Sequence, residues 1–314
     1  MSVLHIRSGR NRPDLVPVLA DFEAATGIRV AYEKVYHRDV GARSRAEAGR
    51  PTADVLITNS RIALEGLRDH DVFVRRPPAI ADALGPDLRA PDFAWVAFTA
   101  WPRVAMVHLG VLPDPAGWPR GLEDLAAPAW RGRVACAAMV EMTTVSQFAS
   151  LAVARDLAFV GGLLDRLVAN GLRILPSNLA TREALVREPL ALGLANASNV
   201  HVFRGEGHPV AEAWLDQEEG GLGTAVEAHA VAVLRGTPRA TEAGLFVDWL
   251  LSVPVQEELA RRYGETPVNP LATCGTVRPL AAICATPAPL PDLMAAIPAV
   301  EDLLRRKGFD VRAT

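Results

Sequence analysis

Short apolar segments alternate with amphipathic segments over the first sixty residues, and this alternation constrains the fold more than any other feature. Strand patterns occupy residues 3–6, 28–36 and 53–58, and helix patterns occupy residues 15–26 and 39–49 between them. Apolar side chains repeat every second residue or run continuously in the strand segments, and every third or fourth residue in the helices. Strands that alternate with helices predict a parallel, doubly wound sheet with right-handed crossovers.

The alternation returns after a Pro-rich stretch, which predicts a second lobe of the same kind. An apolar strand pattern at residues 95–108 is expected to carry the chain from one lobe to the other. Another at residues 224–234 is expected to return it to the first lobe. Two α/β lobes joined by more than one crossing segment predict an inter-lobe cleft that closes on a small ligand.

These crossings set the predicted domain boundaries. The first lobe comprises residues 1–100 plus about 225–275, and the second about 105–220. Helices within residues 276–314 are predicted to pack on the lobes. Half of the 314 residues are apolar, enough to form a core in each of two ordinary domains.

Charge and hydropathy argue against two classes of partner. The formal net charge is −3, and Lys and Arg are scattered without a basic run, so nucleic acid is not expected to bind. The apolar stretch 225–234 is interrupted by Glu227 and His229 and is far shorter than the ~20 residues that span a bilayer. No membrane span is therefore predicted.

The N-terminus leaves two cellular locations open. Residues 1–11 enter a strand pattern without a basic region and an apolar region in front of it, so no signal peptide is visible. If a signal peptide was removed, the protein is periplasmic; if Met1 is the native start, it is cytoplasmic.

The three cysteines, Cys136, Cys274 and Cys284, match no zinc spacing. Three buried thiols are expected, with a Cys274–Cys284 bridge as the alternative. The seven histidines have no metal-ligand spacing, and no Gly-rich phosphate loop or nucleophile elbow is present. No cofactor, catalytic residue or bound metal is predicted.

Several segments match one known family in order and at compatible spacing. Leu122-Glu-Asp-Leu-Ala-Ala-Pro-Ala-Trp-Arg-Gly-Arg is similar to that family's Tyr-x-Asp-Leu-Ala-x-Pro-x-Trp-Lys-Gly-Lys, and Thr52-Ala-Asp-Val-Leu-Ile-Thr-Asn is similar to its Pro-Ala-Asp-Val-x-x-Thr-Glu. Asp21-Phe-Glu-Ala-Ala-Thr-Gly-Ile-Arg-Val and Thr266-Pro-Val-Asn-Pro also match. The chain resembles the ferric-ion-binding branch of the periplasmic ABC-transporter solute-binding proteins. This resemblance implies a two-lobed, type II periplasmic-binding-protein fold.

The resemblance also places the family's iron ligands on this chain, and all of them are replaced. The family's His, its Glu and its two adjacent Tyr residues fall on Asn11, Asn59, Ser198 and Asn199. Fe³⁺ prefers hard, anionic oxygen ligands, which amide and hydroxyl groups do not supply. Direct binding of Fe³⁺ by these residues is therefore not expected.

The part of the family's site that holds an anion is better preserved. Arg103 corresponds to an arginine that holds an anion in the family, and a guanidinium suits carboxylate or phosphonate. Thr143 and Thr144 lie where the family opens a helix whose backbone amides bind the anion. The structural alternatives are a helix cap for the threonines and a surface ion pair for Arg103.

Other polar residues are candidate ligand contacts. Ser8 and Arg10 follow the first strand, and Asn178 precedes a helix in the second lobe, where caps and turns are the alternative roles. Glu227 and His229 lie two apart on a strand and therefore share a face. Glu227 is predicted to neutralise a ligand amine and His229 to donate a hydrogen bond; the alternative is that they satisfy each other.

The leading hypothesis is a solute-binding protein that closes on a small anion or zwitterion, such as a phosphonate, a carboxylate or an amino acid. The resemblance implies a permease of an ABC importer as partner and, by analogy, a monomer. Two alternatives stay open. One is a cytoplasmic enzyme with Glu227 and His229 as acid–base groups. The other is a metal-binding protein that uses Glu227, His229 and Glu141.

Overall fold

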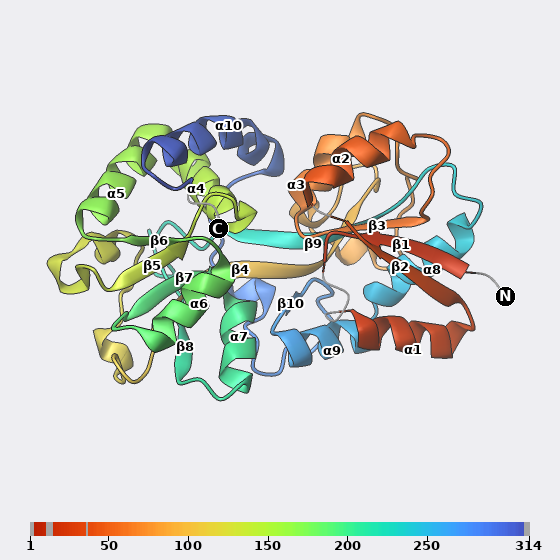
Figure 1. Cartoon of the computed structure of the whole chain (residues 1–314). Coiled ribbons are helices and arrows are strands. Elements are labelled where there is room, and N and C mark those ends of the chain that lie inside the picture. Colours follow the sequence, from red (N-terminus) through yellow and green to blue (C-terminus); the bar gives the residue numbers. More distant parts are fainter. Residues whose placement is uncertain (1–2, 11–14, 36, 311–314) are drawn as a thin grey trace. The chain divides into compact units, whose positions relative to one another are not determined.

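The computed structural model describes residues 3–10, 15–35 and 37–310 (Figure 1). Asn11, a predicted ligand contact, lies outside the described residues. The chain divides into two compact units, one formed by residues 1–100 and 228–277 and the other by residues 101–227 and 278–314. We call them unit 1 and unit 2.

The sheet of unit 1 has the order β2-β1-β3-β9, and β1 runs parallel to both β2 and β3. β9 is antiparallel to β3, and the short β10 pairs with the part of β4 that belongs to this unit. The strands are β1 (Val3–Ser8), β2 (Arg29–Lys34), β3 (Val55–Thr58), β4 (Val96–His108), β9 (Val226–Val233) and β10 (Thr266–Pro267).

Helices cover both faces of this sheet, with α2 and α3 on one face and α1, α8 and α9 on the other (Figure 1). They are α1 (Val16–Thr26), α2 (His37–Ala46), α3 (Arg61–Arg68), α8 (Ala240–Leu250) and α9 (Val253–Tyr263). Phe22 of α1 is fully buried, and its ring packs edge-on against Phe246 of α8 at 5.1 Å between centroids. Gly27 ends α1 with φ of 72°, a conformation that glycine adopts without strain.

Unit 2 contains a mixed sheet in which β4, β7, β5 and β6 follow one another and β8 pairs on the other side of β4. β5 is parallel to β6 and to β7, whereas β4 is antiparallel to β7. The new strands are β5 (Val134–Ala137), β6 (Arg173–Leu175), β7 (Leu192–Asn196) and β8 (Val210–Ala213). The carboxyl ends of β5, β6 and β7 therefore meet at one edge of the sheet.

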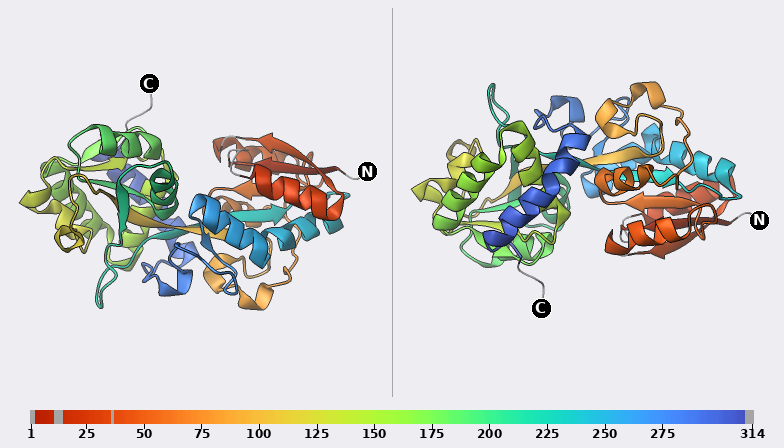
Figure 2. Two further views of the ribbon diagram at one scale, coloured as in Figure 1. Left: turned by 90° about the horizontal axis from the view of Figure 1, so that it is seen from below. Right: turned by 90° about the horizontal axis from the view of Figure 1, so that it is seen from above.

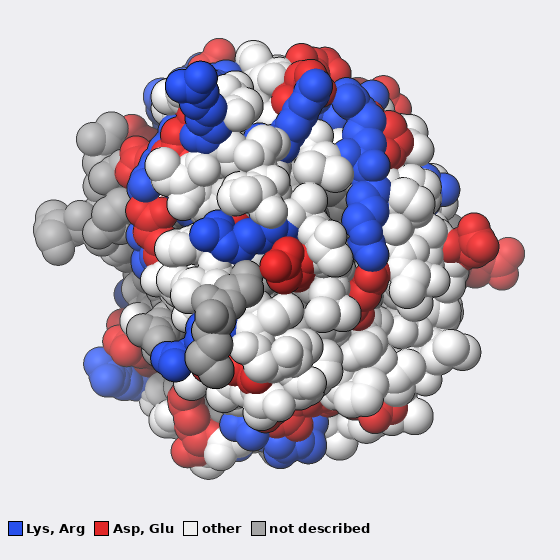
Figure 3. Space-filling model, turned by 90° about the vertical axis from the view of Figure 1, so that its right-hand side faces the viewer, with Lys and Arg blue, Asp and Glu red and all other residues white. Residues whose placement is uncertain are grey.

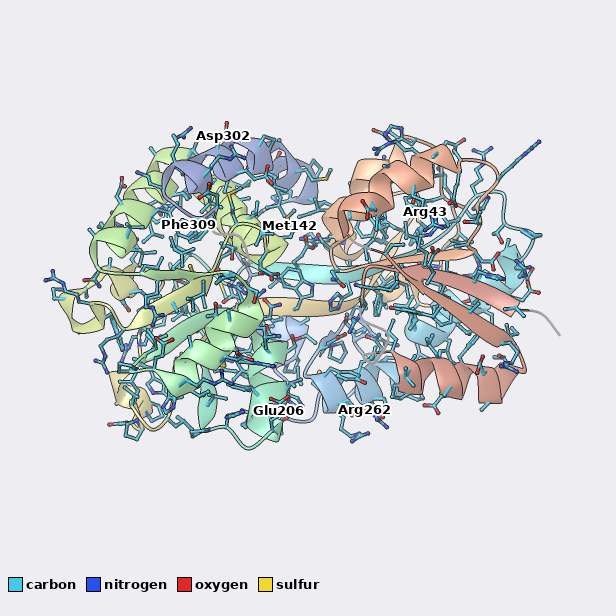
Figure 4. All side chains as sticks on the ribbon, viewed as in Figure 1. Arg43, Met142, Glu206, Arg262, Asp302 and Phe309 are labelled. Carbon is cyan, nitrogen blue, oxygen red and sulfur yellow. The ribbon has the colours of Figure 1, made fainter. Side chains whose placement is uncertain are left out.

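The helices of unit 2 also form two layers, with α4, α5 and α10 on one face and α6 and α7 on the other (Figure 1). They are α4 (Met142–Ala154), α5 (Leu157–Ala169), α6 (Asn178–Arg187), α7 (Ala197–Gly205) and α10 (Leu290–Arg306). α10 packs along α4 (Figure 2). Just after it lies Phe309, which is labelled in Figure 4 and is fully buried. Its ring packs edge-on against that of Phe148 of α4, with 6.1 Å between the ring centroids. The C-terminal segment thus packs on unit 2.

Single turns of 3₁₀ helix occur in the connections of both units. They are η2 (Ala81–Ala83), η3 (Pro86–Leu88), η4 (Pro115–Gly117), η5 (Glu123–Ala126), η6 (Pro128–Trp130) and η7 (Leu280–Ala282). The predicted α/β class is confirmed, and the alternation of strands and helices follows the pattern in the sequence. β8 and β10 were not predicted, because β8 (Val-Ala-Glu-Ala) has no clear apolar alternation and β10 has only two residues.

Charges of both signs are mixed on the face of unit 1 shown in Figure 3. Arg43 of α2, for example, pairs with Glu47 at 3.0 Å and also with Glu33. Within the described part of the chain, no helix is long and apolar enough to cross a membrane.

The cysteines differ in exposure, which corrects the expectation of three buried thiols. All three are free; Cys136 is fully buried, Cys274 is partly buried and Cys284 is exposed. Burial raises the pKa of the Cys136 thiol to about 12, although the charge of Arg103 opposes the shift. Reactivity follows the thiolate, so Cys136 is expected to be inert in the folded protein.

Alkylation by a maleimide is expected to modify Cys284 first, Cys274 more slowly and Cys136 only after unfolding. Peptide mass spectrometry of a time course, with and without urea, measures the three rates. Fast modification of Cys136 in the native protein would contradict this order. A single reactive thiol in urea without reductant would indicate a Cys274–Cys284 bridge instead.

Candidate functional site

Arg103 is a buried cation at the edge of the unit 2 sheet where β5, β6 and β7 end. It lies on β4, paired in register with Asn196, the last residue of β7. Its side chain is 3% exposed. Nε donates to Gln147 Oε1 of α4 at 3.1 Å, and Nη1 donates to Asn196 Oδ1 at 2.8 Å. The remaining nitrogen, Nη2, is buried and has no hydrogen-bond acceptor.

The charge of Arg103 is not neutralised inside unit 2. Both of its partners are neutral amides, and no carboxylate of the described residues lies within ion-pair distance. Burial lowers the pKa of Arg103 to about 10, and the negative charge of Glu141 opposes that shift. The guanidinium therefore remains charged at neutral pH. A buried charge without a counter-ion is costly, so this side chain is suited to receive an anion.

The start of α4 lies beside Arg103, since Gln147 belongs to the second turn of that helix. Its N-cap residue, Glu141, makes no side-chain capping hydrogen bond. Thr144 is 1% exposed and its hydroxyl donates to the carbonyl of Ala137 at 2.9 Å, so its predicted role as a ligand donor does not fit this geometry. The hydroxyl of Thr143 instead accepts a hydrogen bond from Asn178.

Asn178 links the start of α6 to the start of α4. Its Nδ2 donates to Glu141 Oε2 at 3.2 Å and to Thr143 Oγ1 at 3.1 Å. Its Oδ1 is buried and has no donor. The helix cap is supplied by the preceding residue, Ser177, whose hydroxyl accepts from Ala180 N at 3.1 Å. Asn178 is thus not needed as a cap.

The start of α7 is the third helix start at the sheet edge where Arg103 lies. Asn196 is the N-cap residue, but its Oδ1 accepts from Arg103 instead of capping the helix. Ser198 and Asn199 lie in the first turn, and Asn199 Oδ1 is buried without a partner. Three helix N-termini, which carry orphan N–H groups and the positive ends of helix dipoles, therefore begin at this edge. Sequence reasoning missed Gln147 and Asn196, the two hydrogen-bond partners of Arg103.

Arg10, a predicted anion contact, is instead part of a buried ion pair in unit 1. Its Nη1 donates to Glu265 Oε2 at 3.1 Å and its Nη2 to Glu265 Oε1, and both side chains are 4% exposed. Ser8 Oγ accepts from the backbone N–H of Arg10 at 3.0 Å, which holds the loop in place. Because Glu265 already matches the charge of Arg10, we do not assign a ligand anion to Arg10.

His229, whose side chain is 15% exposed, hydrogen-bonds with the same network. Arg10 Nη1 donates to its Nδ1 at 2.8 Å, and Thr99 Oγ1 lies 2.9 Å from the same atom while donating to Glu265 at 2.6 Å. Burial and the positive charge of Arg10 lower the pKa of His229. Burial alone would raise the pKa of Glu265, but Arg10 and His229 bring it far below its ordinary value.

The remaining candidates lie elsewhere. Asn59 follows β3, and its Nδ2 donates to the carbonyl of Gly9 at 3.4 Å. Glu227 lies on β9, is 2% exposed and has interaction partners, so the structure gives no separate support for its predicted contact with an amine. Among the described residues, no group of three or more His, Cys, Asp or Glu side chains is arranged to hold a metal ion.

Acidification is expected to destabilise the protein through His229. Its pKa is about 6.5 when unfolded and lower when folded, so the unfolded chain takes up a proton first. The contribution is complete above pH 6.5 and is lost as the pH falls below 6.5 towards the folded pKa. One such proton changes the free energy of unfolding by at most about 1.4 kcal/mol per pH unit.

Urea denaturation between pH 7.5 and pH 5.5 measures this dependence. The variant His229→Asn cannot titrate there and is expected to have the flatter profile, whereas His70→Asn, an exposed histidine, serves as the control. Equal slopes for the wild type and His229→Asn would contradict the prediction.

Comparisons with known proteins agree with the resemblance seen in the sequence. Residues 4–264 match the family model described as bacterial extracellular solute-binding protein. The iron uptake protein A1 of Synechocystis is 30% identical over 262 residues, which cover 79% of this chain and 71% of that protein.

Solved structures of similar fold cover nearly the whole chain. Iron-bound HitA of Pseudomonas aeruginosa has a TM-score of 0.84 at 21% identity and covers 98% of this chain and 100% of its own. A Trichodesmium protein in complex with iron and citrate has a TM-score of 0.80 at 18% identity, with 98% and 100% covered. AfuA of Actinobacillus pleuropneumoniae, with fructose-6-phosphate bound, has a TM-score of 0.77 at 16% identity, with 97% of each chain covered. At these identities the likeness shows the fold.

Proposed function

This chain belongs to the bacterial extracellular solute-binding proteins, the family that supplies ABC importers with solutes, and we propose that it recognises its solute through an oxyanion group held by Arg103. The group is a phosphate, a phosphonate or a carboxylate. The observation that carries this proposal is the buried Nη2 of Arg103, which has no acceptor, on a guanidinium that has no carboxylate partner among the described residues.

The surroundings of Arg103 support an oxyanion. A helix N-terminus binds anions through free backbone N–H groups and its dipole. α4, α6 and α7 all begin at the edge where Arg103 lies. Gln147 and Asn196 hold two of the guanidinium nitrogens, so the third is held in a defined direction. Preorganised donors of this kind bind an oxyanion without first having to become ordered.

Ferric iron is the second candidate solute, because several relatives are named for iron. Asn59, Ser198 and Asn199 offer neutral oxygens, which are weak ligands for Fe³⁺. The Trichodesmium structure holds iron together with citrate, an anion that Arg103 could contact in this chain. Iron would then reach this protein as an anionic chelate and use the same guanidinium.

Isothermal titration calorimetry separates these solutes. The probes are inorganic phosphate, ethyl phosphate, citrate, Fe³⁺ with citrate, and Fe³⁺ supplied as its weak nitrilotriacetate complex. Binding of a phosphate or carboxylate without iron supports the proposal. Binding of Fe³⁺ from nitrilotriacetate, with no response to any anion alone, overturns it in favour of an iron site. A response confined to Fe³⁺ with citrate supports recognition of the chelate through its carboxylates.

The cellular setting follows from the family. Its members are periplasmic, and we propose that this chain is exported and delivers its solute to an ABC permease. Fractionation of cells that express the native gene tests the location. Recovery of the protein only in the cytoplasm would contradict export.

A further inference from the structure

Glu141 is a carboxylate without a cationic partner among the residues that the structure describes, and it lies close to Arg103, the cation without a carboxylate partner. Glu141 caps α4 but makes no side-chain capping bond. Its Oε2 accepts from the neutral amide of Asn178 at 3.2 Å. Within the described part of unit 2, no Lys, Arg or His nitrogen lies within 4.0 Å of this carboxylate, since no ion pair includes it. Glu141 is nonetheless near enough for its charge to act on Arg103.

The amide next to Glu141 adds a second acceptor that lacks a donor. Because a carboxylate only accepts hydrogen bonds, the contact with Glu141 determines which end of the Asn178 amide is Nδ2. The Oδ1 atom is therefore the free end, and it is buried without a donor. A buried amide oxygen left without a hydrogen-bond donor is destabilising. The partly exposed carboxylate of Glu141 and the buried Oδ1 of Asn178 therefore suit a shared hydrogen-bond donor, preferably a charged one.

Among the described residues, Arg103 lacks an anionic partner, the neighbouring Glu141 lacks a cationic partner, and Asn178 Oδ1 lacks a donor. We therefore infer that the solute is a zwitterion whose oxyanion binds Arg103 and whose protonated amine binds Glu141 and Asn178. The inference rests on the proposed function and names the class of solute. Arg103 and Glu141 carry opposite charges but are not paired with each other. A ligand with the opposite arrangement of charges satisfies both. The sequence had assigned the amine to Glu227, whereas the contacts favour Glu141.

A matched series of phosphate monoesters isolates the amine. Ethyl phosphate, 2-hydroxyethyl phosphate and 2-aminoethyl phosphate share the oxyanion and differ only at the far end. Hydrogen bonds to charged groups contribute about 1.5–3 kcal/mol, so 2-aminoethyl phosphate is expected to bind at least about tenfold more tightly than ethyl phosphate. The affinity of 2-hydroxyethyl phosphate, whose hydroxyl is neutral, is expected to lie between these two. Calorimetry measures the three affinities.

The variant Glu141→Gln keeps the shape of the side chain and removes its charge. It is expected to lose the preference for 2-aminoethyl phosphate over ethyl phosphate, while ethyl phosphate binds no more weakly than to the wild type, because a negative charge near the oxyanion is removed. Asn178→Ala is expected to reduce the preference for both the amine and the hydroxyl. Since Glu141 makes no capping bond and Ser177 caps α6, neither variant removes a helix cap. Glu183→Gln, at a partly exposed site on α6, is the control.

The outcomes separate the two proposals. Equal affinity for all three monoesters, with ethyl phosphate bound, overturns the zwitterion and leaves the oxyanion site intact. An amine preference that survives in Glu141→Gln also overturns the assignment to Glu141. Failure of all three monoesters to bind, together with failure of glycine, acetate, inorganic phosphate and citrate with and without Fe³⁺, overturns both proposals.

Discussion

Replacing Arg103 with Gln is expected to weaken binding of the solute at least about thirtyfold. Removing one partner of a buried, hydrogen-bonded charge pair typically costs about 2–5 kcal/mol of binding free energy. Arg103 is buried, and its Nη2 has no hydrogen-bond acceptor among the described residues of the protein. An incoming oxyanion therefore loses its main charge partner in the variant. Calorimetry with the tightest-binding probe measures the effect.

Two further variants distinguish recognition from folding. Arg103→Lys keeps a charge but lacks the guanidinium fork, so we expect an intermediate loss. Arg131→Gln, at an exposed arginine of the same unit, is expected to bind normally. The unliganded Arg103→Gln protein is expected to be at least as stable as the wild type, because an uncompensated buried charge is removed. Wild-type affinity in Arg103→Gln would contradict the oxyanion site.

Replacing Glu265 with Ala is expected to destabilise unit 1 by about 3–5 kcal/mol, because Arg10 is then left as a buried charge without its partner. Both side chains are 4% exposed and form two hydrogen bonds with each other. Thr99 and His229 lose the same carboxylate. A lower urea midpoint, followed by circular dichroism, measures the loss.

The Arg10–Glu265 pair itself contributes less to the free energy of unfolding than the effect of Glu265→Ala suggests. Replacing both members with apolar residues of similar size, as in Arg10→Met with Glu265→Leu, is expected to recover much of the stability. Glu258→Gln is the control, because Glu258 pairs with the exposed Arg261 and Arg262 and such pairs contribute about 0–1 kcal/mol. An effect of Glu265→Ala no larger than that of Glu258→Gln would contradict the prediction.

Local patterns placed two of the three helices that begin at the candidate site, whereas α7 (Ala197–Gly205) was not predicted. The helix that follows β5 was expected near Thr143, and α4 begins at Met142. Asn178 was expected at a helix start and is the first residue of α6. Such positions are readable because a helix start depends on neighbours within a few residues. Gln147 was missed because its contact with Arg103 joins residues 44 positions apart, which leaves no local signal.

The sequence by itself determined that this is an α/β chain, which family it resembles and which polar residues end the strands, because those features depend on periodicity and short motifs. Only the tertiary structure decided which charged side chains already have an oppositely charged partner within the protein. Arg10 and Arg103 are equivalent cations in the sequence, yet Arg10 meets Glu265, 255 positions away, and Arg103 meets only neutral amides. The energy of a charge depends on what lies within a few ångströms of it and on burial, and folding sets both.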